Sequence, residues 1–392
     1  MTDLNTDWTR AGPAPSPLSG AKRTWTGRQN QLDRSNMTRS GHHFTGFPNA
    51  ALSRYDAGPE PWGAMRRREF ITFVGVTAAW PLRASAQQAD RVRRVAVLMG
   101  YAEEDRETKA RLAAFQQRLE KRGWFEGRNL HIEVRFVDST RGNYEALAKE
   151  LVATEPDVVL AHTTLVTAAL QAVSRGMPVV FVNVSDPIGS GFVASLARPG
   201  GNLTGVLQYE ASVVGKWLAM LKEIAPHLEH VAFVANPKTT PYEYFLRAVG
   251  AAAKPLAIKL VASPVATAAD IEHAIESFAS VPNGGLLLPP DSTTILHRDL
   301  IIALAARHKL PAVYPFYFFV AAGGLMSYGT NQDDMFRLAA SYVDRVLRGD
   351  KPADLPVQAP TKFETTINVR TARALEVVIP SGLLVAADEV IE

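Results

Sequence analysis

The sequence of 392 residues contains no cysteine. Disulfide bridges, thiolate zinc sites and cysteine nucleophiles are therefore excluded. The sequence also lacks a Gly-x-Gly-x-x-Gly loop, a Walker loop and a Gly-x-Ser-x-Gly elbow, so no nucleotide cofactor and no hydrolase nucleophile is predicted. His227 and His230 lie three residues apart on a polar stretch without an acidic partner pattern, and we predict no metal site.

The net positive charge of the chain comes from its first part. Residues 1–86 hold 11 of the 42 Lys and Arg residues but only 6 of the 39 Asp and Glu residues. The remaining 306 residues therefore carry a net charge of −2, although the whole chain has +3. Without a basic face, a nucleic-acid partner is not expected. A segment of this length is also close to the size at which one core divides into two domains.

An export signal is predicted at residues 65–86, within "MRRREFITFVGVTAAWPLRASAQQ". Three arginines precede an apolar run that is too short to span a bilayer, and Ala84-Ser85-Ala86 forms a small-x-small cleavage site. The Arg-Arg-Arg-Glu-Phe-Ile order resembles a twin-arginine motif. We expect cleavage before Gln87 and a bacterial periplasmic location; the alternative is a short buried helix with a basic cap.

Residues 1–64 are rich in Ser, Thr, Pro, Gly, Asn and Arg and show no apolar periodicity. Such a segment buries too little apolar area to offset its ordering entropy. Two interpretations remain open: the natural start is Met65 and the upstream residues are a mis-called start, or they form a disordered extension.

Strand and helix patterns alternate from Arg93 onward, which is typical of a parallel sheet with helices on both faces. Apolar runs predict strands at 93–100, 129–138, 156–162, 177–184, 230–236, 258–265, 284–290, 310–316, 323–329 and 362–369. Helical spacing of apolar residues predicts helices at 107–123, 144–155, 165–176, 214–226, 242–256, 268–281, 298–309, 333–349 and 370–376.

The two halves of this series repeat one plan: "RRVAVLMG" and "EHVAFVAN" each open a unit, and "MPVVFVN" and "LPAVYPF" each follow a helix. We therefore predict an α/β fold with two similar Rossmann-like lobes joined by a multi-strand hinge. A Pro/Gly interruption at 195–206 and two later segments would cross between the lobes, near Gly205, near Met326 and beyond Gly349. The predicted lobes are 93–206 with about 327–349, and 207–326 with about 360–392.

Candidate ligand-binding residues lie in loops at the carboxyl ends of the predicted strands, where parallel sheets bind ligands. Hydroxyls at a helix start suit an anion, and aspartates suit a cationic amine. Tyrosines would supply apolar walls. The candidates are Tyr101, Thr163, Thr164, Asp186, Asn236, Asp291, Ser292, Tyr314 and Tyr328.

Structural roles compete with these assignments. Each Ser or Thr could be a helix N-cap, and Asp186 could be the turn residue of an Asp-Pro step. Tyr314 belongs to the aromatic run "YPFYFF", in which Phe318 and Phe319 favour core packing. These alternatives stay open at the level of the sequence.

Several long motifs resemble the substrate-binding proteins of ABC importers, of the type grouped with tryptophan/tyrosine import. These motifs are "GWFEGRNLHIEVRF", "PVVFVNVSDPIGSGFVASLARPGGNLTGV", "PPDSTT" and "YGTNQDDMFRLAASYVDRVLRGDKPADLPVQAPTKFETTINVRTARAL". The resemblance covers about Arg93 to Glu392. It implies a periplasmic-binding-protein type I-like fold, a small-molecule ligand, and a membrane permease and ATPase as partners. All the candidates above except Tyr314 correspond to ligand-facing positions of the family. The loop "HTTLVTAAL" departs from the alanine-and-proline form that is common in the family. The resemblance therefore does not identify the ligand.

We therefore predict a solute-binding receptor rather than an enzyme. Its ligand would be a zwitterion with an apolar side chain, because a sugar site would call for more tryptophan than Trp124 and Trp217 after the signal. A secreted enzyme using Asp186 and Asp291 as an acid/base pair is one alternative. A periplasmic sensing module with the same fold is another.

Overall fold

The computed structural model describes residues 91–137, 142–174, 176–210 and 212–392. The predicted export signal at 65–86 and the segment 1–64 lie outside the described residues. All described residues belong to one unit, Phe70–Glu392, which comprises two lobes, each built on its own sheet.

The sheet of the first lobe consists of five described strands, all parallel, in the order β2-β1-β3-β4-β5. The buried residues of β1 alternate between two cores: Val95 and Val97 face one, and Ala96 and Leu98 face the other. This period of two explains why the strand is apolar throughout, since both faces of a parallel sheet are covered. The strands are β1 (Arg93–Met99), β2 (Leu130–Phe136), β3 (Val158–His162), β4 (Val179–Val184) and β5 (Leu203–Leu207).

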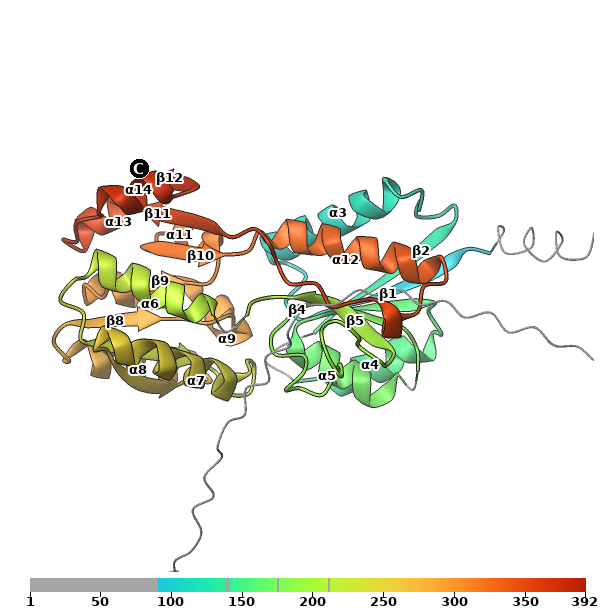
Figure 1. The fold of residues 1–392 in the computed structure, drawn as a ribbon, viewed down its shortest axis with the longest axis horizontal. Helices are drawn as coiled ribbons and strands as arrows, with labels where there is room; N and C mark the ends of the chain where they lie inside the picture. The colour runs from blue at the N-terminus through green and yellow to red at the C-terminus, as the bar shows by residue number, and fades with distance from the viewer. Residues whose placement is uncertain (1–90, 138–141, 175, 211) are drawn as a thin grey trace, which may run out of the picture. The chain divides into compact units, whose positions relative to one another are not determined.

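Helices cover both faces of this sheet (Figure 1). On one face, α3 (Arg106–Glu120) packs beside α12 (Gln332–Leu347), and Phe115 and Phe336 share a core with the strands. On the other face, α4 (Tyr144–Ala153) packs beside α5 (Thr164–Val173). The helix that completes the first lobe thus comes from a late part of the sequence.

The sheet of the second lobe has seven described strands in the order β12-β11-β10-β9-β8-β6-β7. All neighbours are parallel except β10 and β11. Its strands are β6 (His230–Ala235), β7 (Lys259–Pro264), β8 (Gly284–Leu287), β9 (Ala312–Tyr314), β10 (Met326–Gly329), β11 (Glu364–Asn368) and β12 (Glu389–Ile391).

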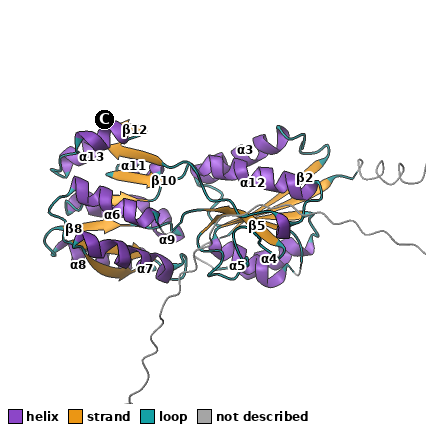
Figure 2. Ribbon diagram, viewed as in Figure 1, coloured by secondary structure: helices purple, strands orange, loops and turns teal. Residues whose placement is uncertain are grey.

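Helices flank this sheet too, as Figure 2 shows by colour, and fully buried Trp217 and Phe233 lie in one continuous core with it. The helices are α6 (Val213–Ile224), α7 (Tyr242–Ala253), α8 (Ala268–Ala279), α9 (Ser292–Leu296), α10 (Arg298–Arg307), α11 (Tyr317–Ala321), α13 (Val369–Ala374) and α14 (Ser381–Ala386). Two 3₁₀ turns, Lys254–Leu256 and Pro352–Asp354, complete the described helical segments.

The chain passes between the two sheets after β5, after β10 and again before β11. We expected the return to the first lobe from about residue 327, but β10 pairs with β9 and β11 in the second sheet, so only α12 returns. The last passage is anchored on the first lobe, where the Leu207 N–H donates to the Gln358 carbonyl at 2.9 Å and the Gln358 N–H donates to the Gly205 carbonyl at 3.0 Å.

Strand β5 lies inside the segment that the sequence marked only as a Pro/Gly interruption. Gly205 is required there because a Cβ at this position would stand 2.0 Å from the carbonyl oxygen of Phe181 in β4. Its φ of +154° is also one that side-chain-bearing residues rarely adopt. Gly205 therefore permits the close approach of β5 to β4. Because glycine is unusual in strands, the sequence did not predict β5.

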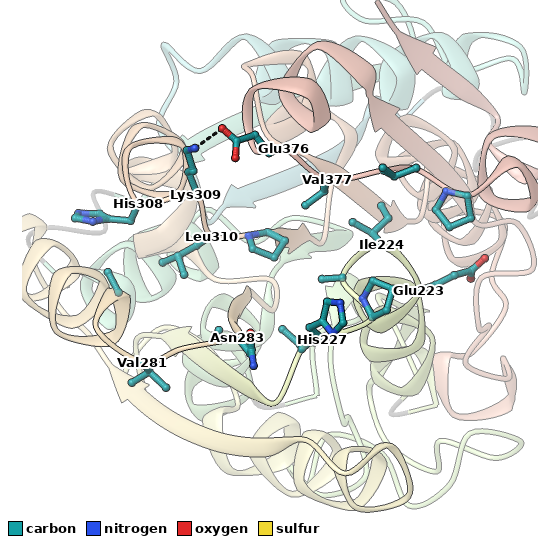
Figure 3. Close-up of a pocket in the computed structure, with 18 residues that line it drawn as sticks. Glu223, Ile224, His227, Val281, Asn283, His308, Lys309, Leu310, Glu376 and Val377 are labelled. Carbon is teal, nitrogen blue, oxygen red and sulfur yellow. Dashed lines mark hydrogen bonds and ion pairs between the residues drawn. The ribbon is translucent and has the colours of Figure 1, made fainter.

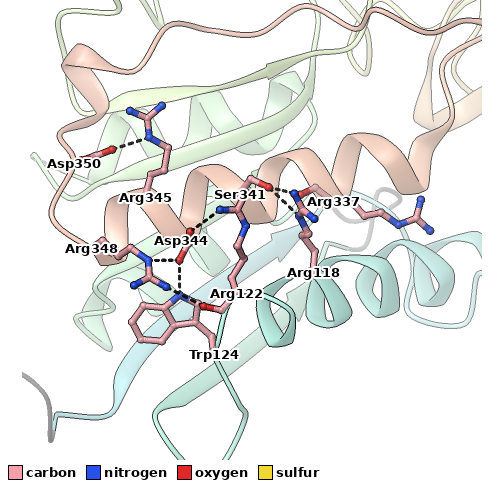
Figure 4. Close-up of polar contacts among 9 residues, drawn as sticks. All are labelled: Arg118, Arg122, Trp124, Arg337, Ser341, Asp344, Arg345, Arg348 and Asp350. Atoms are coloured by element: carbon pink, nitrogen blue, oxygen red, sulfur yellow. Dashed lines mark hydrogen bonds and ion pairs between the residues drawn. The ribbon is translucent and has the colours of Figure 1, made fainter.

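Asp344 in α12 contacts residues of the segment that follows α3 through a hydrogen bond and an ion pair (Figure 4). Asp344 is 3% exposed, and its carboxylate accepts a hydrogen bond from the Trp124 indole at 2.9 Å. It also pairs with Arg348 at 2.6 Å and with Arg122 at 3.5 Å. A buried carboxylate with this many donors stabilises the attachment of α12.

The predicted α/β class with two lobes and mostly parallel sheets is confirmed by the strand order. No helix in the part of the chain described here has both the length and the apolar character needed to cross a membrane.

Candidate functional site

A small cavity lies between the lobes at the carboxyl ends of strands from both sheets, and its volume is about 20 Å³. This is room for about one water molecule, so the site is nearly closed. The first lobe contributes Tyr101, Thr163, Thr164, Asn183, Ser185 and Gln208. The second lobe contributes Thr239, Thr240, Pro241, Pro290, Asp291 and Ser292.

Thr163 sits at the junction of β3 and α5 with φ +83°, outside the regions that β-branched residues normally occupy. The Thr163 N–H donates to the carbonyl of Val182 in β4 at 3.0 Å, which holds the strained backbone in place. No side chain caps the start of α5. The first turn of this helix therefore presents backbone N–H groups beside the cavity, a favourable place for an anion.

His162 lies immediately before this junction and is fully buried. The Gly100 N–H lies 3.3 Å from its Nδ1, and the side-chain amide of Asn183 lies 3.2 Å from its Nε2. Burial, followed by the positive charge of Arg111, holds the pKa of His162 well below its usual value. The ring stays neutral and packs edge-on against Tyr101 at a centroid distance of 4.6 Å.

Asp291 is 2% exposed and is the only carboxyl group among the described residues that line the cavity. It caps α9: its Oδ1 accepts from the Thr294 N–H at 2.8 Å, and its Oδ2 accepts from the Thr239 hydroxyl. Burial outweighs these hydrogen bonds and raises the pKa of Asp291 to about 6. Asp291 forms no ion pair with a described residue, and a buried carboxylate of this kind is suited to an incoming ammonium group.

Six of the nine predicted site residues lie in or directly behind the cavity. Tyr101, Thr163, Thr164, Asp291 and Ser292 line it. Asn236 stands behind, where its amide donates to the Thr293 hydroxyl at 2.9 Å and its oxygen accepts from the Lys238 N–H at 2.9 Å. Asn236 therefore supports the loop beside Asp291.

The other three predicted residues lie elsewhere. Asp186, with φ +47°, accepts from the Gly189 N–H at 2.8 Å and closes the turn after β4. Tyr314 is 1% exposed and stacks on Phe319 at 4.9 Å in the core of the second lobe. Tyr328 stacks on Phe363 at 5.3 Å beside the passage between the lobes. The cavity contains none of these side chains.

Sequence reasoning missed several polar residues of the cavity. Asn183 in β4 and Ser185 just after it precede Asp186, which alone was selected there. Thr239 and Thr240 follow Asn236, which alone was selected in that loop. Gln208 directly follows β5. The end of this strand would have pointed to Gln208, but the strand was not predicted because it contains Gly205. Two side-chain atoms facing this region, Oδ1 of Asn183 and Nε2 of Gln208, are buried without a hydrogen-bond partner among the described residues.

Polar contacts also join the lobes next to the cavity. Asp105 of the first lobe pairs with Arg298 of the second at 3.2 Å. Two residues later, in the first turn of α3, Glu107 accepts a hydrogen bond from the Tyr317 hydroxyl at 2.9 Å. The helix that covers the first sheet is thus attached directly to the second lobe.

A larger hollow of about 640 Å³ lies at the opposite, amino-terminal ends of the strands of the second sheet (Figure 3). It borders the starts of β8 and β9, with Asn283 and Leu310 in its wall, and an ion pair between Lys309 and Glu376 lies at its edge. Ligands of open parallel sheets bind at the carboxyl ends of the strands. The smaller cavity, with both lobes in its wall, is therefore the better candidate for ligand binding.

Comparison with known proteins adds a family to this geometry. Residues 95–391 match the model of a family described as ABC transporter substrate binding protein. A conserved domain protein from Vibrio cholerae superposes with a TM-score of 0.72 at 26% identity, over 76% of this chain and 100% of that one.

Two further relatives have ligands in their descriptions. An ABC domain from Streptococcus pneumoniae, solved in complex with L-Trp, superposes with a TM-score of 0.71 at 22% identity, over 76% of this chain and 99% of that one. The tyrosine-binding protein of Clostridioides difficile is 24% identical over 262 residues, which are 67% of this chain and 75% of that protein. The resemblance seen in the motifs is thereby confirmed.

Proposed function

Because the chain belongs to the family of ABC transporter substrate binding proteins, we propose that it captures an amino acid with an aromatic side chain between its lobes. It would then deliver this ligand to the permease of an ABC importer, which an ATPase drives. The cavity between the lobes supports this proposal, since it combines an uncapped helix start with one buried carboxylate. The L-Trp complex and the tyrosine-binding relative favour an aromatic amino acid over other zwitterions.

The proposed ligand fits the charges of the site. Its ammonium group would pair with Asp291, which has no cation partner among the described residues. Its carboxylate would lie on the positive side of the site, which includes the N-terminal turn of α5 at Thr164. Tyr101 offers an aromatic face, and burial raises the pKa of its phenol to about 12, so that it stays neutral. A catalytic acid/base pair is not proposed, since Asp186 holds a turn instead of lining the cavity.

Thermal unfolding in the presence of single amino acids tests the proposal. At 100 times the Kd, a ligand that binds only the folded protein adds about 2.7 kcal/mol, a rise of roughly 5 °C or more in Tm. We expect this rise with L-tryptophan or L-tyrosine and none with glucose, an uncharged control of similar size. Stabilisation by glucose alone would contradict the proposed ligand class.

We also propose that the protein acts in the bacterial periplasm after cleavage before Gln87. The charged, apolar and small-residue order of the segment 65–86 supports this location. N-terminal sequencing of the protein from a periplasmic fraction tests it. A mature protein that still carries residues 1–64 would contradict it.

A further inference from the structure

Arg111 is a buried cation that forms no ion pair with any described residue. It lies in α3 and is 1% exposed, and none of its Nε, Nη1 and Nη2 atoms has a hydrogen-bond partner among the described residues. A guanidinium carries five N–H donors and remains protonated at any pH at which proteins fold. Burying such a group without an anion is among the least favourable arrangements in a protein interior.

The surroundings of Arg111 place it between the lobes. Its guanidinium carbon lies 5.3 Å from the ring centroid of Tyr101 in the first lobe and 5.8 Å from that of Phe318 in the second. Tyr101 is also a wall residue of the cavity. Cation–π contacts with two rings replace only part of the hydration that the guanidinium loses, and they leave its donors unused.

The carboxylates closest along this helix are already engaged. Asp105 caps α3 and pairs with Arg298, and Glu107 accepts from the Tyr317 hydroxyl. Across the cavity, Asp291 is held by Thr239 and Thr294. The described residues therefore provide an anionic partner for Arg298 but none for Arg111.

Other unused donors accompany Arg111. The hydroxyl of Thr108, one turn earlier on the same face of α3, is buried without a partner among the described residues, and so is Nε2 of Gln208 in the cavity wall. Burial and the positive charge of Arg111 lower the pKa of His162, so this ring is neutral and provides no negative charge. The first-lobe side of the site thus holds several donors that have no acceptor among the described residues.

We infer that Arg111 binds the carboxylate of the ligand, so that the site selects amino acids over the corresponding amines. This inference rests on the proposed function and deepens it. A guanidinium matches a carboxylate with two parallel hydrogen bonds, and Arg111 and Asp291 together complement both charges of an amino acid. The cavity of about 20 Å³ has to widen for such a ligand, and lobe opening, which moves Phe318 of the second lobe away from Arg111, exposes the guanidinium to it.

Calorimetry on three proteins tests the inference: the unchanged protein, Arg111→Met and Arg111→Lys. Each is titrated with L-tyrosine and L-tryptophan and with tyramine and tryptamine, which lack only the carboxylate. The unchanged protein should prefer each amino acid to its amine by roughly 100-fold or more. Arg111→Met should reduce this preference to less than about tenfold, with Arg111→Lys between the two, because an ammonium keeps the charge but not the bidentate geometry.

The unliganded proteins supply a readout that a purely structural role would not produce. Replacing an unpaired buried cation by methionine should raise the Tm of the ligand-free protein while it weakens binding. Equal losses of affinity for amino acid and amine, or a lower Tm of ligand-free Arg111→Met, would overturn the inference.

Failure of the proposed function gives a different result. If the unchanged protein binds neither aromatic amino acid, that function is wrong. The same three proteins are then titrated with a panel of small monocarboxylates and their uncharged amides. Binding of a carboxylate that requires Arg111 supports the inference, binding of amides alone contradicts it, and if nothing binds, the Tm of the ligand-free variant decides.

Discussion

The guanidinium of Arg298 and the carboxylate of Asp105 form a 3.2 Å ion pair between positions 193 residues apart. Asp105 belongs to the first lobe and Arg298 to the second, so the pair can exist only while the lobes are together. Both side chains are partly shielded, at 16% and 29% exposure. The pair therefore contributes to holding the two lobes together.

Weakening this pair should accelerate ligand release. Asp105→Asn keeps an oxygen to cap α3 but removes the charge, and we expect ligand dissociation to become about three- to tenfold faster, as for loss of a pair worth about 1 kcal/mol. Stopped-flow displacement measures this rate. Asp299→Asn is the matched control, because its carboxylate is 87% exposed and lies 4.0 Å from the same arginine. An equal rate in Asp105→Asn and the control would exclude a role of the pair in closure.

Asp291 should carry most of the recognition of the ligand's ammonium group. Asp291→Asn preserves an acceptor for the Thr294 N–H, and we expect a loss of about 2–5 kcal/mol in binding free energy because the ammonium becomes buried without a partner. Asp186→Asn, in the turn outside the cavity, should keep the affinity within about a factor of two. Calorimetry with the same amino acid distinguishes the two, and similar losses would show that charge at the cavity wall is not decisive.

Binding should weaken in acid with the titration of Asp291. Its pKa of about 6 means that the carboxyl group is protonated below this pH, and the ammonium ligand must then displace a proton. The affinity should fall about tenfold per pH unit below 6 and stay level just above it. In Asp291→Asn this dependence should be absent, and a persistent slope would assign it to another group.

The same group predicts how the stability of the ligand-free protein changes with pH. Its pKa is raised from 3.8 to about 6, so between these values the folded state holds a proton that the unfolded state has released. Stability should therefore fall as pH rises from about 4 to 6, by roughly 3 kcal/mol. Denaturant unfolding at several pH values measures the unfolding free energy of the protein and of Asp291→Asn. The pH-dependent difference between the two should vanish below pH 4.

Asp344 should be important for stability but not for ligand recognition. Asp344→Ala removes the acceptor for the Trp124 indole and the partner of Arg348, and we expect a loss of about 1–3 kcal/mol in unfolding free energy. Asp350→Ala breaks an exposed pair with Arg345 and should cost less than about 0.5 kcal/mol. Equal Tm values of the two variants would contradict this assignment.

Gly205→Ala should be strongly destabilising, by at least about 3 kcal/mol, since the new methyl group collides with the backbone of β4 at Phe181. Gly201→Ala, where no atom lies within 4 Å of the added Cβ, is the control and should change the Tm little. Thermal unfolding of both variants tests this, and a mild effect of Gly205→Ala would show that β5 can shift away from β4.

The local pattern of the sequence determined the class of the fold, because apolar runs such as Val95–Met99 and the helical spacing of Leu112, Phe115 and Leu119 depend only on neighbouring residues. It also indicated several of the loops that line the cavity between the lobes, since the end of a parallel strand is visible in the sequence. Tyr101, Thr163, Thr164, Asp291 and Ser292 were identified in this way and line the cavity.

The tertiary structure decided the rest, because it depends on pairs of residues far apart in the chain. β5 can pair with β4 because Gly205 allows a close approach to Phe181. Asp186 accepts a hydrogen bond within its own turn, whereas Asp291 lines the cavity. In the sequence, Arg111 is one of several charged residues in a predicted helix, and nothing distinguishes it from the others. In the tertiary structure, Tyr101 from one lobe and Phe318 from the other pack against its guanidinium, and none of its nitrogens has a hydrogen-bond partner among the described residues.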